Sequence, residues 1–225
     1  MQNHTPSNPE ILVSARMLVD YIDAFGDFRG GQNILDVASG LSSFHREAEM
    51  LGLNVTAVDP AYARPPEALL NDYRRAIETL PKRWCHAPDT FMDIHPDVLR
   101  ERLLQEESQA IVTAANLPVR LRTGQAIIAA LPNLPFVDHQ FDVALCSHFL
   151  FLYDRIFNLD FHIAAIEEMI RVAKTVMIFP LISLSTGLTS PLVSEITRYF
   201  GDRCAIEPAK NAFRRHANTR LVITR

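Results

Sequence analysis

Residues 33–59 constrain the fold more than any other part of this chain. A short apolar run at 33–37 leads into a loop of small residues at 38–43, and apolar residues then recur at helical spacing over 44–51. A second apolar run follows at 54–59. A strand, a loop, a helix and a strand in this order form a βαβ unit, which implies parallel strands joined by a right-handed crossover.

The remainder of the chain alternates between apolar runs of strand length and patterns of helical spacing. We expect further strands at 125–129, 141–146, 175–179, 205–207 and 221–224, and helices at 9–25, 67–80, 96–109, 160–173 and 192–199. Asn8 and Asp160 stand where they would cap the first and the fourth of these helices. Strands that alternate with helices indicate an open α/β sheet.

The stretch 61–118 separates the second expected strand from the third. A crossover between parallel strands needs only about a dozen residues or somewhat more, so we expect a helical insertion here, within a single domain that spans 1–225. Strand-like runs resume at 119–129. Because loops on such scaffolds often carry specificity, we expect the insertion to cover a substrate site.

Charge and apolar content narrow the possible partners. With 26 acidic against 22 basic residues, the net charge is −4, and no basic stripe suits a nucleic-acid backbone. The most hydrophobic runs, around 144–153 and 175–184, are well short of the ~20 residues that cross a bilayer. The start of the chain does not resemble a secretory signal. We therefore expect a cytoplasmic protein that acts on a small molecule and engages neither nucleic acid nor a membrane.

Ligands of open α/β sheets bind in the crevice beyond the carboxyl ends of the strands. Asp36 stands near the end of the first strand, before the small-residue loop, whose backbone a ligand can approach closely. Asp59 ends the second strand, where a carboxylate can accept hydrogen bonds from ribose hydroxyls. The two acids and the loop therefore form the candidate binding site.

This pattern resembles that of the class I S-adenosylmethionine-dependent methyltransferases. In that family the first strand leads into a loop of the form D-x-G-x-G-x-G, and here Asp36-Val-Ala-Ser-Gly-Leu-Ser42 keeps only the central glycine. Val58-Asp59-Pro60 is similar to the second acid of the family, and residues 131–142 are similar to the segment that enters its fourth strand. The resemblance spans roughly residues 33–180.

The resemblance implies a fold, a cofactor and an activity. The fold is a Rossmann-like three-layer sandwich whose seven-stranded sheet is mostly parallel, with an antiparallel last strand. The cofactor is S-adenosyl-L-methionine, and the activity is methyl transfer to a small-molecule acceptor. Asp36 would reach the methionine ammonium, and Asp59 would hold the ribose. The implied cofactor contacts are Asp36, Ala38, Gly40, Ser42, Asp59, Pro60, Ala130, Leu131 and Ser147.

Methyl transfer requires a base only where the acceptor must lose a proton. His148 follows the fourth strand, and its imidazole titrates near neutrality, so it is the leading candidate for that base, ahead of Tyr153. Asp154 and His162 are further candidates. His148 also stands in an apolar stretch, which a hydrogen-bonded core histidine would equally suit. The acids and histidines of 86–95 match no standard ligand spacing, and we expect no metal.

Two alternatives stay open on the sequence alone. A protein that keeps the methyltransferase fold for binding or regulation, without turnover, would also account for the reduced glycine content of the loop. A nicotinamide-dependent oxidoreductase would require G-x-G-x-x-G, whereas the loop offers Ala38, Gly40 and Ser43.

Overall fold

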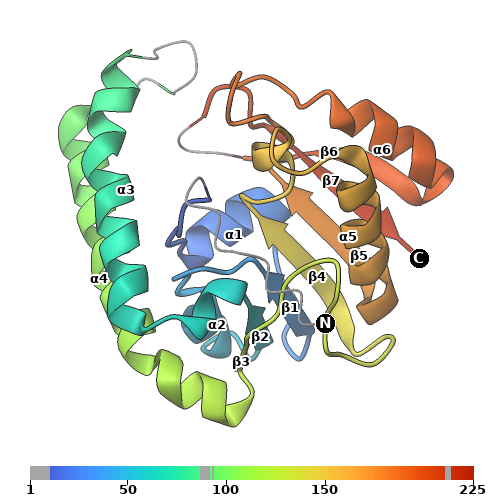
Figure 1. The fold of residues 1–225 in the computed structure, drawn as a ribbon, viewed down its shortest axis with the longest axis horizontal. Helices are drawn as coiled ribbons and strands as arrows, with labels where there is room; N and C mark the ends of the chain where they lie inside the picture. The colour runs from blue at the N-terminus through green and yellow to red at the C-terminus, as the bar shows by residue number, and fades with distance from the viewer. Residues whose placement is uncertain (1–10, 87–91, 93, 211–213) are drawn as a thin grey trace.

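A seven-stranded sheet forms the centre of the protein (Figure 1). The computed structural model describes residues 11–86, 92, 94–210 and 214–225. The strands are β1 (Asn33–Val37), β2 (Asn54–Val58), β3 (Ala126–Ile127), β4 (Phe141–Ser147), β5 (Ala173–Phe179), β6 (Cys204–Pro208) and β7 (Thr219–Thr224). Their order across the sheet is β3-β2-β1-β4-β5-β7-β6.

One strand, β7, runs against the others. Strands β1 to β5 pair in parallel, and β7 pairs antiparallel with β5 on one side and with β6 on the other. The expected fold is therefore confirmed as a Rossmann-like three-layer sandwich with an antiparallel last strand. Each expected strand is present, with its ends displaced by at most two residues, and the predicted bounds of β1 match the observed ones.

Helices cover both faces of the sheet (Figure 1). They are α1 (Leu18–Phe25), α2 (Phe44–Glu49), α3 (Pro66–His86), α4 (Pro96–Thr123), α5 (Leu159–Val172) and α6 (Leu192–Phe200), with 3-10 turns η1 (Pro60–Ala63), η2 (Phe151–Tyr153) and η3 (Gly201–Arg203). Alternation along β1 separates the two sides, because Ile34 packs with α1 and α2 whereas Leu35 packs with α5 and α6. Within the described residues, none of the helices combines the length and the apolar character that a bilayer crossing requires.

Helices α3 and α4 fill most of the stretch between β2 and β3 and lie side by side at one edge of the molecule (Figure 1). The expected helix at 96–109 continues to Thr123, so the prediction of a strand-like run at 119–123 is wrong. Pro118 lies inside this helix, where it removes one backbone hydrogen bond. Leu117 and Arg120 are buried on either side of it, and this packing keeps the helix intact through the proline.

The expected helix at 9–25 is present only in its second half, as α1. Residues 11–17, here called the strap, are irregular, and residues 8 and 9 lie outside the described part of the chain. Carbonyl groups of the strap accept hydrogen bonds from the loop after β1. The N–H of Leu41 donates to Ser14 O at 2.9 Å, and the N–H of Ser43 donates to Arg16 O at 2.9 Å. These tertiary hydrogen bonds take the place of the intrahelical ones that the spacing predicted.

The N-terminus of α5 also differs from its prediction. Asn158, rather than Asp160, caps this helix, because its side-chain oxygen accepts a hydrogen bond from the backbone N–H of Phe161 at 3.0 Å. Asp160 lies in the first turn, where its charge complements the helix dipole.

Candidate functional site

The two acids predicted to bind a ligand lie at neighbouring strand ends. Strands β1 and β2 pair in parallel with Val37 opposite Val58, so Asp36 and Asp59 reach the same edge of the sheet. The loop 38–43 leaves β1 at this edge and leads into α2. The structure thus brings together the acids and the loop that the sequence singled out.

Asp36 is buried and is held by hydroxyl groups. It is 1% exposed, and Tyr21 of α1 donates its hydroxyl to the carboxylate at 2.8 Å from one oxygen and 2.9 Å from the other. Ser39 donates a further hydrogen bond at 2.6 Å. Burial raises the pKa of Asp36 to about 7, against the opposing effect of these donors and of the positive charge of Arg120. This carboxyl group therefore titrates near neutral pH.

Asp59 fastens the loop to the start of η1. One carboxylate oxygen accepts from the backbone N–H of Gly40 at 2.9 Å, and the other accepts from that of Ala61 at 2.8 Å. Burial raises the pKa of Asp59, and these two N–H groups lower it in part. Each oxygen can accept a second hydrogen bond, so the carboxylate retains capacity for a ligand. Pro60 is exposed and begins η1.

The backbone at Gly40 requires glycine. Its φ is +56°, and a Cβ atom there would lie 2.7 Å from the carbonyl oxygen of Ser14 in the strap. The strap therefore lies against that side of Gly40. Tyr62 supports the loop from η1 by donating its hydroxyl to the carbonyl of Gly40 at 2.9 Å. Ala38 also has a φ of 56°, a conformation that the glycine of the family pattern adopts without the same steric penalty.

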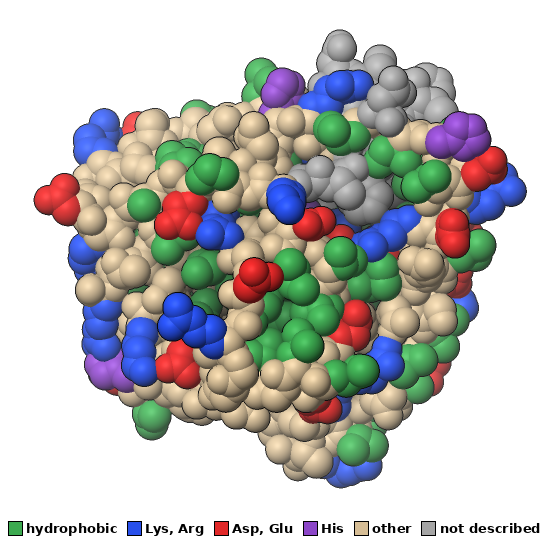
Figure 2. Space-filling view, turned by 180° about the vertical axis from the view of Figure 1, so that it is seen from behind, with side chains coloured by type: hydrophobic (Ala, Val, Ile, Leu, Met, Phe, Trp, Pro, Cys, Tyr) green, Lys and Arg blue, Asp and Glu red, His purple; other side chains and the backbone are tan. Residues whose placement is uncertain are grey.

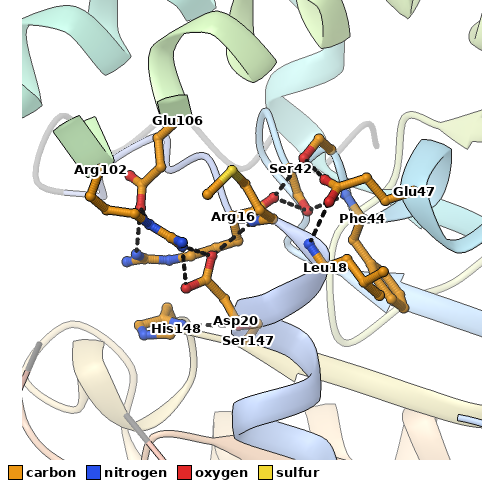
Figure 3. A network of polar contacts seen from close by, with 12 residues as sticks. Arg16, Leu18, Asp20, Ser42, Phe44, Glu47, Arg102, Glu106, Ser147 and His148 are labelled. Atoms are coloured by element: carbon orange, nitrogen blue, oxygen red, sulfur yellow. Dashed lines mark hydrogen bonds and ion pairs between the residues drawn. The ribbon is translucent and has the colours of Figure 1, made fainter. Parts of the chain in front are cut away.

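The hydroxyl of Ser42 is engaged within the protein. It donates to the carbonyl of Arg16 in the strap at 3.0 Å and accepts from the backbone N–H of Phe44 at 3.1 Å (Figure 3). Ser42 is 1% exposed. It thereby joins the strap, the loop and the start of α2, and its contact with a cofactor stays a prediction.

At the end of β4, His148 lies beside Ser147 (Figure 3). Nδ1 of His148 is 2.9 Å from Oγ of Ser147, and the ring packs edge-on against Phe179 with centroids 5.4 Å apart. Its backbone has a φ of 56°, and its N–H donates to the carbonyl of Phe179 at 2.6 Å. Burial, together with the positive charges of Arg16 and Arg214, holds the pKa of His148 well below its usual value. The imidazole is therefore neutral at pH 7, and the expectation that it titrates near neutrality is wrong, because the ring is buried.

Ion pairs join the α3–α4 hairpin to the strap and α1 near His148 (Figure 3). Arg102 of α4 contacts Asp20 of α1 at 2.5 Å and Glu106 of its own helix at 3.0 Å. Arg16 of the strap lies 4.0 Å from Glu106. Glu106 is 4% exposed, and burial raises its pKa. These contacts hold the hairpin against the N-terminal part of the protein, above the end of β4.

The other predicted catalytic residues make structural contacts. The hydroxyl of Tyr153 is buried and accepts from the backbone N–H of Leu12 in the strap at 3.0 Å, and burial raises its pKa. Asp154 accepts hydrogen bonds from two serine hydroxyls in the segment after β5, each at 2.7 Å. His162 is fully buried, and its Nδ1 lies 2.9 Å from a backbone carbonyl just before α5.

Ala130 and Leu131 follow β3. Ala130 is half-buried and forms an isolated bridge with Asn133, and Leu131 is 7% exposed and packs in the core cluster on the α5 side of the sheet. Among the possible ligands of 86–95, the positions 87–91 and 93 lie outside the described residues. The residues that the structure does describe contain no group of three side chains suited to a metal ion.

Sequence reasoning missed the residues that fasten the acids and the loop, namely Tyr21, Ser39, Tyr62 and the backbone of Ser14. Signals existed for two of them: Tyr21 lies on the buried face of α1, where a tyrosine hydroxyl needs a partner, and Ser39 follows Asp36 by three residues in the small-residue loop. The contacts of Ser14 and Tyr62 depend on the tertiary fold, and nothing in their local sequence predicts them.

No protein-family model matches the sequence. The chain is 30% identical over 194 residues to the uncharacterized protein MJ0045 of Methanocaldococcus jannaschii, a match that covers 85% of each chain. The chain belongs to the family of that protein. Its seven-stranded, mostly parallel sheet, with β7 antiparallel between β5 and β6, is the Rossmann-like fold that the resemblance to the class I S-adenosylmethionine-dependent methyltransferases implied.

Solved methyltransferase structures are similar to this chain at low sequence identity. Magnesium protoporphyrin IX methyltransferase from Synechocystis PCC 6803 is 12% identical, with a TM-score of 0.47, over 92% of this chain and 76% of that one. Phosphoethanolamine N-methyltransferase 2 from Haemonchus contortus is 15% identical, with a TM-score of 0.45, over 84% of this chain. This chain covers 38% of the Haemonchus protein, which is therefore much longer.

Proposed function

We propose that the protein is an S-adenosylmethionine-dependent methyltransferase acting on a small-molecule acceptor. The observation that carries the proposal is the placement of Asp36 and Asp59 at adjacent parallel strand ends, joined by the loop 38–43. When bound, the cofactor supplies a methyl group on a cationic sulfonium, which is open to in-line displacement by an acceptor.

The residues at this edge suit such a cofactor. Both oxygens of Asp59 retain acceptor capacity, as the hydroxyls of a ribose require. Asp36 has a pKa of about 7, so at neutral pH it is readily ionised by a neighbouring cation such as the methionine ammonium. Ala130 and Leu131 follow β3, the neighbour of β2, and are proposed to lie along the adenine.

His148 is proposed to take the proton of the acceptor. Its imidazole is neutral at pH 7, as a general base must be. If Nδ1–H donates to Oγ of Ser147, Nε2 becomes the basic nitrogen. Tyr153 stays protonated because burial raises its pKa, and its hydroxyl already accepts a hydrogen bond from the strap. Tyr153 is therefore the weaker candidate for the base.

The α3–α4 hairpin is proposed to form one wall of the acceptor site, as an insertion at 61–118 within a single domain. The contacts of Arg102 and Arg16 place the hairpin near the end of β4 (Figure 3). A net charge of −4 argues against a nucleic-acid acceptor, since a phosphate backbone requires a basic surface.

The decisive experiment is a calorimetric titration with S-adenosylhomocysteine. Asp59→Ala removes the carboxylate from the ribose and from Gly40, and we expect an affinity loss of about 10- to 100-fold, the usual effect of losing hydrogen bonds to a charged group. The matched control is Asp202→Ala, an exposed acid in η3, which should bind as the wild type does.

Three outcomes would contradict the proposal in different ways. Equal affinity for wild type and Asp59→Ala would exclude the ribose assignment. Binding of NAD in place of S-adenosylhomocysteine would favour an oxidoreductase. Tight binding without transfer of a labelled methyl group to any of a broad acceptor panel would favour a binding protein that retains the fold.

A further inference from the structure

Helix α4 carries apolar residues on two opposite faces, and the fold covers one of them. Ala110, Ala114 and Leu117 are buried in the cluster that joins α4 to α3 and to the edge of the sheet. The opposite face is exposed and forms what we call the outer stripe: Leu104, Ser108, Ile111, Val112, Ala115 and Val119. Recurrence every three to four residues puts these positions on one side of the helix.

The aliphatic side chains of the outer stripe have much of their surface in water. Leu104 is 61% exposed, Val119 is 47% exposed and Ile111 is 42% exposed. On the back of the molecule, hydrophobic side chains lie among charged ones along the side formed by α3 and α4 (Figure 2). A row of exposed aliphatic residues on a regular helix is the kind of surface that a second amphipathic helix covers.

The outer stripe has the same pattern from either end. Leu104 and Val119 are equally far from the peptide bond that follows Ile111, and so are Ser108 and Ala115. In an antiparallel pair of α4 helices with a two-fold axis at this bond, Leu104 of each copy faces Val119 of the other. Ser108 then faces Ala115, and these small residues let the two helices approach closely between the larger pairs.

The charges that flank the outer stripe obey the same symmetry. Glu101 and Arg122 are both exposed and are equally far from the centre of the stripe. Neither takes part in the ion pairs that the described part of the chain forms. Under the two-fold axis each Glu101 faces an Arg122, so opposite charges meet at both ends of the contact.

We infer that α4 is a dimerisation surface, which pairs antiparallel with α4 of a second copy of this chain through the outer stripe. The contact spans residues 101–122, about 33 Å of helix. It is isologous, since the same residues serve both copies, and it closes after two chains. This inference goes beyond the proposed methyltransferase activity and holds whether or not the protein binds the cofactor.

Sedimentation velocity over about 1 to 100 μM protein tests the inference first. We expect the wild type to show a concentration-dependent dimer. Ile111→Glu places a charge at the centre of the contact in both copies and should raise the dissociation constant at least about 100-fold. The matched control is Val137→Glu, which changes a residue that is 71% exposed and lies before β4, and which should leave the dimer intact.

Exchanging the charges at positions 101 and 122 then tests whether the two α4 helices pair antiparallel in the alignment described above. Glu101→Arg and Arg122→Glu should each weaken the dimer, because like charges face one another at both ends. The double variant should dimerise again, and an equimolar mixture of the two single variants should form heterodimers. A monomeric wild type, or a dimer that is insensitive to both Ile111→Glu and charge exchange, would overturn the inference.

Discussion

The end of β4 and the ends of β1 and β2 lie at the same edge of the sheet but are built differently. Asp36 and Asp59 each receive hydrogen bonds from two protein groups, and the loop between them is fixed from the strap and from η1. Within the described residues, the side chain of His148 lies 2.9 Å from the hydroxyl of Ser147 and packs against Phe179. The first region is organised to hold a ligand in one position, whereas the second presents a neutral imidazole whose pKa lies well below its usual value.

His148→Ala is the sharpest test of this contrast. Once an acceptor is known, we expect kcat to fall about 10²- to 10⁴-fold, the usual contribution of a general base, while the affinity for S-adenosylhomocysteine changes little. Steady-state kinetics and calorimetry on the same variant separate the two effects. Full turnover by His148→Ala would show that His148 is not the base. Neither region would then have a role in proton transfer.

The titration of Asp36 provides the second test. Its pKa is about 7 in the folded chain, above its usual value, so the unfolded chain loses this proton first as pH rises. Between about pH 4 and 7 this group therefore lowers the free energy of unfolding by up to about 1.4 kcal/mol per pH unit. We expect chemical denaturation of the ligand-free protein to show this dependence, and Asp36→Asn to reduce it.

The same ionisation affects binding in the opposite direction. A ligand ammonium group beside Asp36 favours the charged form of the carboxyl, so the affinity for S-adenosylhomocysteine, through its amino-acid ammonium, should increase between pH 6 and pH 8 with release of a proton. Calorimetry in buffers of different ionisation enthalpy measures that proton. If the affinity of the wild type for S-adenosylhomocysteine does not depend on pH, ligand binding does not change the ionisation of Asp36.

Gly40→Ala tests how tightly the loop is fixed. The new Cβ would lie 2.7 Å from Ser14 O on a backbone with a φ of +56°, so we expect a loss of about 2 kcal/mol in the free energy of unfolding. The control is Gly52→Ala, which also has a positive φ but has no atom within 4 Å of the added carbon. Equal losses in the two variants would show that the strap does not press against the loop.

Tyr153→Phe should have the smallest effect. It removes the acceptor of a single hydrogen bond from Leu12 in the strap, which corresponds to about 1 kcal/mol of stability. We expect thermal unfolding to shift slightly and kcat to persist. A loss of turnover comparable to that of His148→Ala would instead place the Tyr153 hydroxyl in the reaction.

The sequence predicted those elements whose residues make regular local contacts. Strand β1 has the predicted bounds because its apolar residues are bracketed by a turn and by small residues, and the order of the elements predicted the fold. The cap of α5 was placed two residues too late, and the larger failures were the first half of the expected opening helix and the extension of α4 from 109 to Thr123. For the opening helix and for α4, tertiary contacts, with the loop after β1 and with the sheet edge respectively, outweigh local propensity.

The site was predictable to a similar degree. Asp36 and Asp59 were found because they stand at strand ends, a position that the hydrophobic pattern defines. Their partners come from α1, from the loop and from η1, and only the folded chain brings these together. Ser42 matched a glycine position of the family pattern, and its hydrogen bonds to the strap and to α2 became visible only in the structure.

The contacts between the strap and the loop run through main-chain carbonyls, those of Ser14 and Arg16. Such a contact does not depend on the identity of the side chain at the residue that supplies the carbonyl, so we expect relatives to keep the number of residues in 11–17 more strictly than the side chain at position 14. An insertion or deletion in this segment would shift the carbonyls out of register with the loop. Comparison of sequences by residue identity would then underrate a segment whose length positions the loop after β1.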